Sequence, residues 1–344
     1  MTSNLEEDPQ AVVSAINLDL PSGKAPRPRK PKRIQVLALS GGGYRGLYGA
    51  TFFEHVEKHF GCAVSSKFDL IAGTSIGALL GVSLALEIPA SVIAGKFIKH
   101  GPKIFDRRRM ITWTKKTFFT APYSPKTLEE AIVDTIGRSN AQLSLKAVTK
   151  PLAVVAVNYT TGAPYIFRSK GLAGTAATDA TVLEAVLAST AAPTYFPPQK
   201  VNDQTLIDGG IIANAPEVLA VSEACGTLGW PLRDLYVLGM GTASRRKGAA
   251  LDTSGSPSTI SWMLRRELFQ STLSAQEVLA EAQCRTLLKD RYYRVNREPS
   301  EAQAHSVREF DLATKEATKT LQSLAKDSWE EHRSTQSFRS YFLD

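Results

Sequence analysis

The segment between Phe68 and Glu87 constrains the fold more than any other part of the chain. A short apolar strand over Phe68–Ala72 is followed by Gly73-Thr-Ser75-Ile-Gly77 and then by an apolar helix from Ile76 to about Glu87. A G-x-S-x-G motif between a strand and a helix predicts a nucleophile elbow, in which the flanking glycines permit a strained turn that exposes the serine hydroxyl. The motif therefore predicts an α/β sheet with Ser75 as a nucleophile at the carboxyl end of a strand.

Further apolar strands are predicted along the chain, at 34–40, 152–158 and 235–239, with helical stretches between them near 127–136, 179–189 and 216–225. Apolar strands that alternate with helices are typical of a sheet covered on both faces. Beyond Thr242 the pattern changes. Two long amphipathic stretches, roughly 259–289 and 300–340, predict a helical C-terminal region.

A glycine-rich turn, Ser40-Gly-Gly-Gly-Tyr-Arg-Gly46, joins the first strand to a helix predicted over Leu47–Phe60. Consecutive glycines let backbone N–H groups converge at a helix N-terminus, where they stabilise an anion or a developing oxyanion. The turn also satisfies G-x-G-x-x-G, but Asp69 precedes the end of the second strand, where the acidic residue of a dinucleotide site is expected. A tight turn without a ligand is the remaining alternative for this motif.

A nucleophilic serine needs a base, and Asp208 in Thr205-Leu-Ile-Asp208-Gly209-Gly210 is the best candidate. It follows a short apolar strand, and the two glycines allow its carboxylate to approach another backbone closely. A carboxylate that accepts directly from the serine would be a two-residue form of nucleophile activation. Taken alone, Asp-Gly-Gly also suits a structural turn. His305 or His332 would complete a three-residue triad instead, because either follows the chain order Ser, Asp, His.

Three motifs together, at 40–46, 73–77 and 208–210, resemble the signatures of the patatin-like phospholipases, in the same order. The resemblance extends over about 34–242 and includes the stretches 188–197 and 208–216. One departure is Ser40, which stands where the family usually has Asp or Asn.

This resemblance implies a three-layer α/β/α sandwich with a mostly parallel central sheet and a Ser75–Asp208 catalytic dyad. The domain division that follows is a tail at 1–33, a catalytic domain at 34–242 and a helical C-terminal extension, packed on that domain, at 243–344. The supporting residues are the elbow glycines, the glycines of the Asp-Gly-Gly motif and an oxyanion hole with its basic neighbour, namely Gly73, Gly77, Gly209, Gly210, Gly41, Gly42, Gly43 and Arg45.

Within that family, the size and the C-terminal region (268–277 through 291–295) are similar to the cyclic-nucleotide-activated phospholipases of bacterial CBASS antiphage systems. The resemblance implies that a cyclic di- or trinucleotide such as cGAMP, made by a partner nucleotidyltransferase, activates hydrolysis of membrane phospholipids and kills the infected cell. It further implies a homo-oligomer on activation and no required metal or cofactor. A constitutive soluble lipase or acyl-esterase and a catalytically vestigial ligand-sensing scaffold are the alternatives.

Positive charge is concentrated in one segment of a chain that carries 41 Lys and Arg against 33 Asp and Glu. Lys96–Lys116 holds eight Lys and Arg and one acid, interleaved with large apolar residues. Such a segment suits an anionic bilayer, the phosphates of a cyclic nucleotide, or a solvated helix face whose apolar side is in the core. DNA or RNA is disfavoured, because no recognition fold is evident. The candidate contact residues are Arg107, Arg108, Arg109, Trp113, Lys115 and Lys116.

The remaining features concern the tail and the compartment. The stretch 24–33 has six basic residues and three prolines, which favour an extended segment, either an electrostatic arm or a solvated linker. Cys62, Cys225 and Cys284 form no C-x-x-C pair, and the first residues lack the apolar run of a secretory signal. We therefore expect a cytoplasmic protein whose contact with the inner face of the membrane is peripheral.

Overall fold

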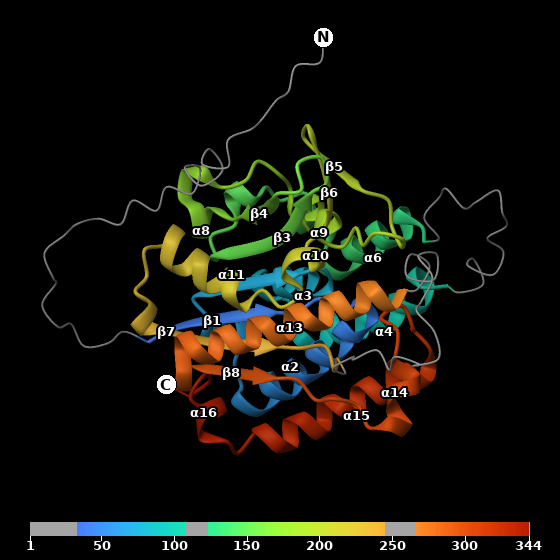
Figure 1. Ribbon diagram of the computed structural model, residues 1–344, viewed down its shortest axis with the longest axis vertical. Helices are drawn as coiled ribbons and strands as arrows, with labels where there is room; N and C mark the ends of the chain where they lie inside the picture. Colours follow the sequence, from blue (N-terminus) through green and yellow to red (C-terminus); the bar gives the residue numbers. More distant parts are fainter. Residues whose placement is uncertain (1–32, 107–122, 245–265, 344) are drawn as a thin grey trace, which may run out of the picture. The chain divides into compact units, whose positions relative to one another are not determined.

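A single mixed sheet forms the framework of the computed structural model, which describes residues 33–106, 123–244 and 266–343 (Figure 1). Its strand order is β5-β6-β3-β2-β1-β7-β8, and β4 pairs with β3 off this path. The neighbours in β3-β2-β1-β7-β8 are parallel, whereas β4, β5 and β6 pair antiparallel. The strands are β1 Ile34–Leu39, β2 Leu70–Thr74, β3 Leu152–Asn158, β4 Pro164–Arg168, β5 Gln199–Val201, β6 Gln204–Asp208, β7 Leu235–Met240 and β8 Tyr292–Val295.

Helices cover both faces of this sheet, so the described chain has three layers. One face packs on α2 Gly46–Phe60, α3 Ile76–Ala85, α4 Ala90–Ile104, α6 Pro125–Ile136, α9 Val182–Ser189 and α15 Lys315–His332. The other face packs on α8 Lys170–Ala173, α11 Glu217–Ser222 and α13 Arg266–Leu288. Shorter helices complete the set: α7 Arg138–Ala141, α10 Gly210–Ala213, α14 Glu301–Val307 and α16 Gln336–Arg339.

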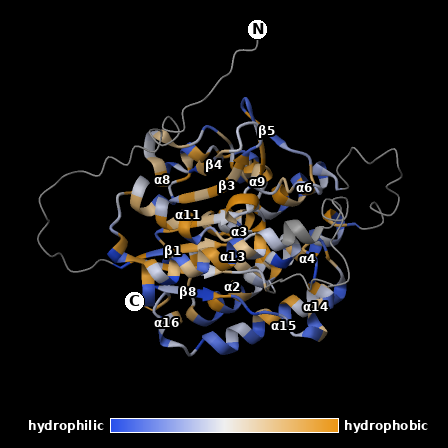
Figure 2. Ribbon diagram, viewed as in Figure 1, coloured by the Kyte–Doolittle hydropathy of each residue, from blue (hydrophilic) through white to orange (hydrophobic). Residues whose placement is uncertain are grey.

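Strand β1 shows why the central strands are apolar on both sides. Leu37 and Leu39 join the hydrophobic cluster that contains α2 and α3, whereas Val36 and Ala38 join the cluster that contains α11. Successive side chains of a strand point to opposite faces, so a strand covered on both faces needs a continuous apolar run. Figure 2 shows this as orange colouring along the central strands, against the mostly blue α15. The predicted fold class, an α/β/α sandwich with a mostly parallel sheet and C-terminal helices, is confirmed.

The C-terminal region differs from the prediction of two long helices. After α13 the chain enters β8, which pairs in parallel with β7 from Val237↔Tyr292 to Met240↔Val295. The predicted 300–340 helix is divided into α14, α15 and α16, and Ser300 and Thr314 cap the N-termini of the first two. The extension predicted at 243–344 is therefore not wholly helical, because one of its segments is an edge strand of the central sheet.

Strand β2 also differs slightly, since it begins at Leu70 and not at Phe68. Asp69 precedes it and accepts the backbone N–H of Gln35. The predicted tail lies, apart from Arg33, outside the described residues. Within the described ranges, none of the helices combines the length and the apolar character needed to cross a membrane.

Candidate active site

Ser75 occupies the turn between β2 and α3 in a strained conformation. Its φ of 56° and ψ of −125° lie in a region that L-residues rarely adopt, at a cost of about 1 to 3 kcal/mol. The Ser189 hydroxyl holds this geometry by accepting the Ser75 backbone N–H at 2.9 Å. A Cβ at Gly73 would lie 2.4 Å from the Gly77 carbonyl oxygen, and a Cβ at Gly77 would lie 2.2 Å from that of Leu39. Both glycines therefore let helix α3 start directly against the strands.

Asp208 ends β6 and faces the elbow. Its Oδ2 accepts a hydrogen bond from Ser75 Oγ at 2.6 Å, and its Oδ1 accepts the Gly210 N–H at 2.7 Å. The side chain is almost fully buried, and this burial raises the pKa of the carboxyl to about 6, although both hydrogen bonds oppose the shift. Gly209 is required by close packing, since a Cβ there would lie 2.3 Å from the Val155 carbonyl oxygen. The structure thus brings the predicted serine and aspartate into direct contact.

The glycine-rich turn presents two backbone donors to the same site. Gly42 and Gly43 line the pocket that contains Ser75, and neither N–H donates to another described residue. Gly43 has a φ of 57°, and a Cβ there would lie 2.4 Å from the Phe310 carbonyl oxygen. Gly41 corrects the prediction, because its N–H already donates to the Asn214 carbonyl oxygen at 2.8 Å. Of the three predicted donors, Gly42 and Gly43 therefore keep N–H groups that no described residue accepts.

Arg45 supports this turn from the side. It does not occur among the described residues that line the pocket, and its Nε donates to the Gly42 carbonyl oxygen at 3.4 Å. Burial lowers the pKa of the guanidinium, and the negative charge of Glu277 opposes that shift. Arg45, the predicted basic neighbour of the oxyanion hole, thus contacts the backbone of the loop.

The pocket above Ser75 is lined mainly by apolar side chains from both the catalytic and the C-terminal regions. Leu273 from α13 and Phe310, which follows α14, contribute to it, so the C-terminal region is part of the site. A largely apolar pocket with a few convergent polar groups is typical of a site for a hydrophobic ligand. Its other large apolar lining residues are Tyr44, Ile76, Leu79, Phe97, Ile104, Phe105, Leu128, Ile132 and Phe196.

The two histidines proposed for a three-residue triad, His305 and His332, are not among the described residues that line the pocket that contains Ser75. His305 is exposed on α14, and His332 pairs through Nδ1 with the Tyr293 hydroxyl at 2.8 Å. The histidine that does line the pocket is His100, whose Nε2 lies 2.6 Å from Asp134 Oδ2. This pair was not predicted, although the basic residues at 96, 99 and 100 have the spacing of one helical face.

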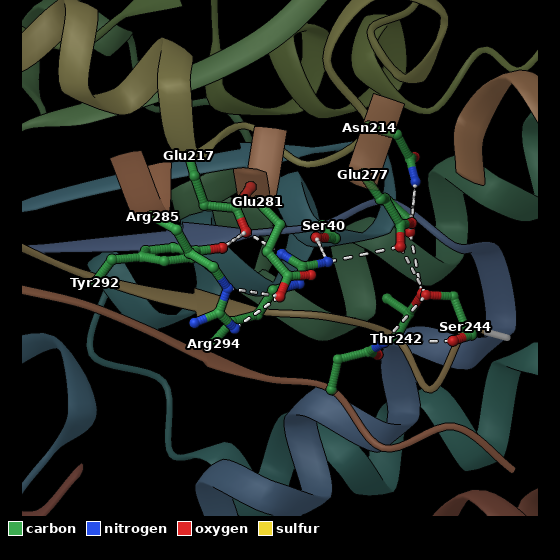
Figure 3. A network of polar contacts seen from close by, with 12 residues as sticks. Ser40, Asn214, Glu217, Thr242, Ser244, Glu277, Glu281, Arg285, Tyr292 and Arg294 are labelled. Atoms are coloured by element: carbon green, nitrogen blue, oxygen red, sulfur yellow. Dashed lines mark hydrogen bonds and ion pairs between the residues drawn. The ribbon is translucent and has the colours of Figure 1, made fainter. Parts of the chain in front are cut away.

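A buried polar network contacts the first residues of the glycine-rich turn, Ser40 and Gly41 (Figure 3). Arg294 of β8 forms an ion pair with Glu217 of α11 and lies 3.6 Å from Glu277 of α13. Its guanidinium also donates to Ser40 Oγ at 3.3 Å, at the start of the turn. Ser40, the one departure from the family pattern, therefore accepts a charged donor. Burial raises the pKa of Glu217, and the adjacent guanidinium opposes this.

Glu277 connects the network to the turn through a second route. One of its carboxylate oxygens accepts from Asn214 Nδ2 at 2.6 Å, and the other accepts from the Ser244 hydroxyl at 2.7 Å. Asn214 in turn accepts the Gly41 N–H, and the Thr242 hydroxyl donates to the Gly41 carbonyl oxygen at 3.2 Å. These residues come from four separate segments of the chain, so no local spacing in the sequence predicts that they meet.

The predicted basic contact residues cannot be placed in this site. Arg107, Arg108, Arg109, Trp113, Lys115 and Lys116 lie outside the described residues. Three lysines of the same basic segment, Lys96, Lys99 and Lys103, are described, and the first two form ion pairs with Asp134 on α6. Among the described residues there is no group of three or more His, Cys, Asp and Glu side chains that could hold a metal ion.

A serine on a strand-to-helix elbow, hydrogen-bonded to a buried carboxylate beside an apolar pocket, defines a serine acyl hydrolase. The model of the family described as Patatin-like phospholipase matches residues 37–221, which is 185 of the 344 residues. The chain belongs to this family.

Several curated relatives are named for activation by a nucleotide. A cGAMP-activated phospholipase of Pseudomonas aeruginosa (strain BWHPSA011 / Pa011) is 34% identical over 83% of this chain and 85% of its own length. Another cGAMP-activated phospholipase, of Escherichia coli (strain TW11681), is 29% identical over 72% of this chain and 74% of its own length. A cUMP-AMP-activated phospholipase of Escherichia coli is 27% identical over 60% of this chain and 64% of its own length. The structure of VipD from Legionella pneumophila aligns over 87% of this chain and 67% of its own with a TM-score of 0.37 and 14% identity, too weak a likeness for inference.

Proposed function

We propose that this protein hydrolyses the acyl esters of membrane glycerophospholipids with Ser75 as nucleophile and Asp208 as base, and that a cyclic oligonucleotide activates it. The observation that carries the proposal is the 2.6 Å hydrogen bond from Ser75 Oγ to Asp208 Oδ2 beside an apolar pocket. The names of its relatives, cGAMP-activated and cUMP-AMP-activated phospholipase, support nucleotide control.

In the first half of the reaction, Ser75 Oγ attacks the ester carbonyl carbon while its proton moves to Asp208 Oδ2. The carbonyl oxygen becomes an oxyanion, which the N–H groups of Gly42 and Gly43 stabilise. Such donors are typically worth about 2.7 to 4 kcal/mol each in the transition state. The tetrahedral intermediate then breaks the bond to the alcohol oxygen, which takes the proton from Asp208 and leaves as a lysophospholipid.

In the second half, water replaces the alcohol. Asp208 accepts a proton from the water as its oxygen attacks the acyl carbon, and the proton then returns to Ser75 as the fatty acid leaves. The raised pKa of Asp208 supports this role, because a carboxylate with a pKa of about 6 is ionised at neutral pH and yet more basic than an exposed one. The mechanism requires no metal or cofactor.

The biological role we propose is antiphage defence. A nucleotidyltransferase partner would make the cyclic di- or trinucleotide on infection, and the activated enzyme, as a homo-oligomer, would degrade the inner face of the cell membrane from the cytoplasm. The similarity to nucleotide-activated relatives over most of the chain supports this proposal.

The test is fatty-acid release from vesicles of phosphatidylethanolamine and phosphatidylglycerol, with and without a panel of cyclic nucleotides that includes cGAMP and cUMP-AMP. We expect release only with one or a few of them. Fatty-acid release without any nucleotide would instead identify a constitutive lipase. Nucleotide binding without fatty-acid release would identify a vestigial scaffold. Ser75→Ala should abolish release, while Ser66→Ala, at an exposed position before β2, should not. Full activity of Ser75→Ala would refute the dyad.

A further inference from the structure

A charged cluster lies at the wall of the otherwise apolar pocket. Lys96, Lys99 and His100 share one face of α4, and all three contact Asp134 on α6. The Nζ atoms of Lys96 and Lys99 lie 2.8 Å from separate carboxylate oxygens, and His100 Nε2 lies 2.6 Å from one of them. Lys96 and His100 also line the pocket that contains Ser75 and Asp208.

The cluster carries more positive charge than its own carboxylate neutralises. Two ammonium groups and one carboxylate leave a net positive charge. The donors, Lys96 first among them, hold the pKa of Asp134 well below its usual value, so the carboxylate stays ionised. The side chains of Lys96 and Lys99 are 27% and 55% exposed, so neither ammonium group is fully enclosed. Lys96 lines the pocket, and Lys99 lies beside it on the same carboxylate.

Stability alone does not explain this arrangement. An exposed ion pair typically contributes about 0 to 1 kcal/mol, and a single lysine would suffice to link α4 to α6. Charged groups beside an apolar pocket are unfavourable unless they are paired or bind a ligand. The surplus positive charge therefore suggests that an anion enters the pocket together with an apolar group.

We propose that Lys96, Lys99 and His100 form a phosphate subsite, which binds the phosphodiester of a glycerophospholipid while its ester reaches Ser75. The inference rests on the proposed function, in which the substrate is a phospholipid. Two ammonium groups match the two non-bridging oxygens of a phosphodiester, and such charge-assisted hydrogen bonds are among the strong ones. The glycerol backbone separates phosphate and ester by only a few bonds, so both must be bound within one pocket. Asp134 is a positioning residue that holds the three donors together.

A kinetic experiment tests this assignment. The substrates are dihexanoyl-phosphatidylglycerol and dihexanoylglycerol, both used as monomers so that adsorption to a membrane does not contribute. Every assay contains, at saturation, the cyclic nucleotide that activates wild type in the vesicle test. Replacing both lysines by methionine (Lys96→Met with Lys99→Met) should lower kcat/KM for the phospholipid about tenfold or more and leave the neutral ester within twofold. The double arginine variant should retain most of the preference. Lys103→Met, at an exposed position on the same helix, should change neither substrate.

A binding experiment separates the two sources of a phosphodiester, lipid and nucleotide. In the Ser75→Ala background, the double methionine variant should bind dihexanoyl-phosphatidylglycerol more weakly and cGAMP as before. Loss of cGAMP affinity alone would assign the cluster to the activator and overturn the subsite, as would an equal kinetic loss on both esters or no loss at all. If wild type neither binds nor cleaves the phospholipid with any nucleotide of the panel present, the proposed function itself fails. If wild type cleaves it and the variant keeps the preference, only the subsite fails.

Discussion

Replacing Asp208 by asparagine should abolish catalysis and stabilise the fold at the same time. The carboxyl group has a pKa of about 6 in the folded protein, against an ordinary value of 3.8, because it is buried. Between these two values the folded state binds more protons than the unfolded chain. The stability of the wild type therefore falls as the pH rises from about 4 to about 6. A shift of about two pKa units, at 1.36 kcal/mol per unit, corresponds to about 3 kcal/mol.

Asparagine removes this dependence with little change of shape. Its Oδ1 can still accept the Gly210 N–H, and its amide can donate to Ser75 Oγ, but it cannot accept a proton. We expect hydrolysis to fall by at least about 100-fold, the usual contribution of a general base. The unfolded carboxyl is already about half ionised at pH 4. The advantage of the variant over the wild type in free energy of unfolding should therefore be about 2.5 kcal/mol larger at pH 8 than at pH 4.

The assay is urea unfolding followed by tryptophan fluorescence at one-unit steps from pH 4 to pH 8. Asp203→Asn, in the exposed turn before the same strand, is the matched control and should follow the wild-type curve. A difference between Asp208→Asn and wild type that stays constant across this range would refute the reasoning. The reasoning would also be refuted if the free energy of unfolding of the wild type rose relative to that of the variant between pH 4 and pH 6.

Three further predictions follow from the same structure. The kcat/KM of the wild type should fall about tenfold per pH unit below pH 6, because protonated Asp208 cannot act as a base; a profile that is flat down to pH 4 would contradict this. Arg294→Met should lower the free energy of unfolding by about 3 to 5 kcal/mol, because it leaves Glu217 buried without its partner. Adding Glu217→Gln should recover much of this loss, and an additive double variant would argue against a buried charge. Gly77→Ala should destabilise by about 1 to 3 kcal/mol through overpacking. Gly95→Ala, in open space on α4, should stabilise by up to about 1 kcal/mol, so equal effects of the two would be the contrary result.

The sequence by itself determined the features that depend on local backbone geometry. The elbow at Ser75 requires glycine at 73 because the Gly77 carbonyl oxygen, four residues on, leaves no room for a Cβ. That requirement is visible as a motif. The apolar runs of β1, β3 and β7 indicate strands buried on both faces for a similarly local reason.

Only the tertiary structure decided which distant groups meet. Ser75 and Asp208 are 133 residues apart in the sequence. They meet because β3 pairs with both of their strands: its first part, 152–155, pairs with β2, and its last part, 156–158, pairs with β6. The use of the Gly41 N–H by Asn214 and the position of His100 in the pocket have no counterpart in local spacing. The short strand β8, which includes the charged Arg294, was missed because its role depends on partners in α11 and α13. Motifs encode what a residue's immediate neighbours require, whereas donors, charges and pocket walls are set by long-range packing.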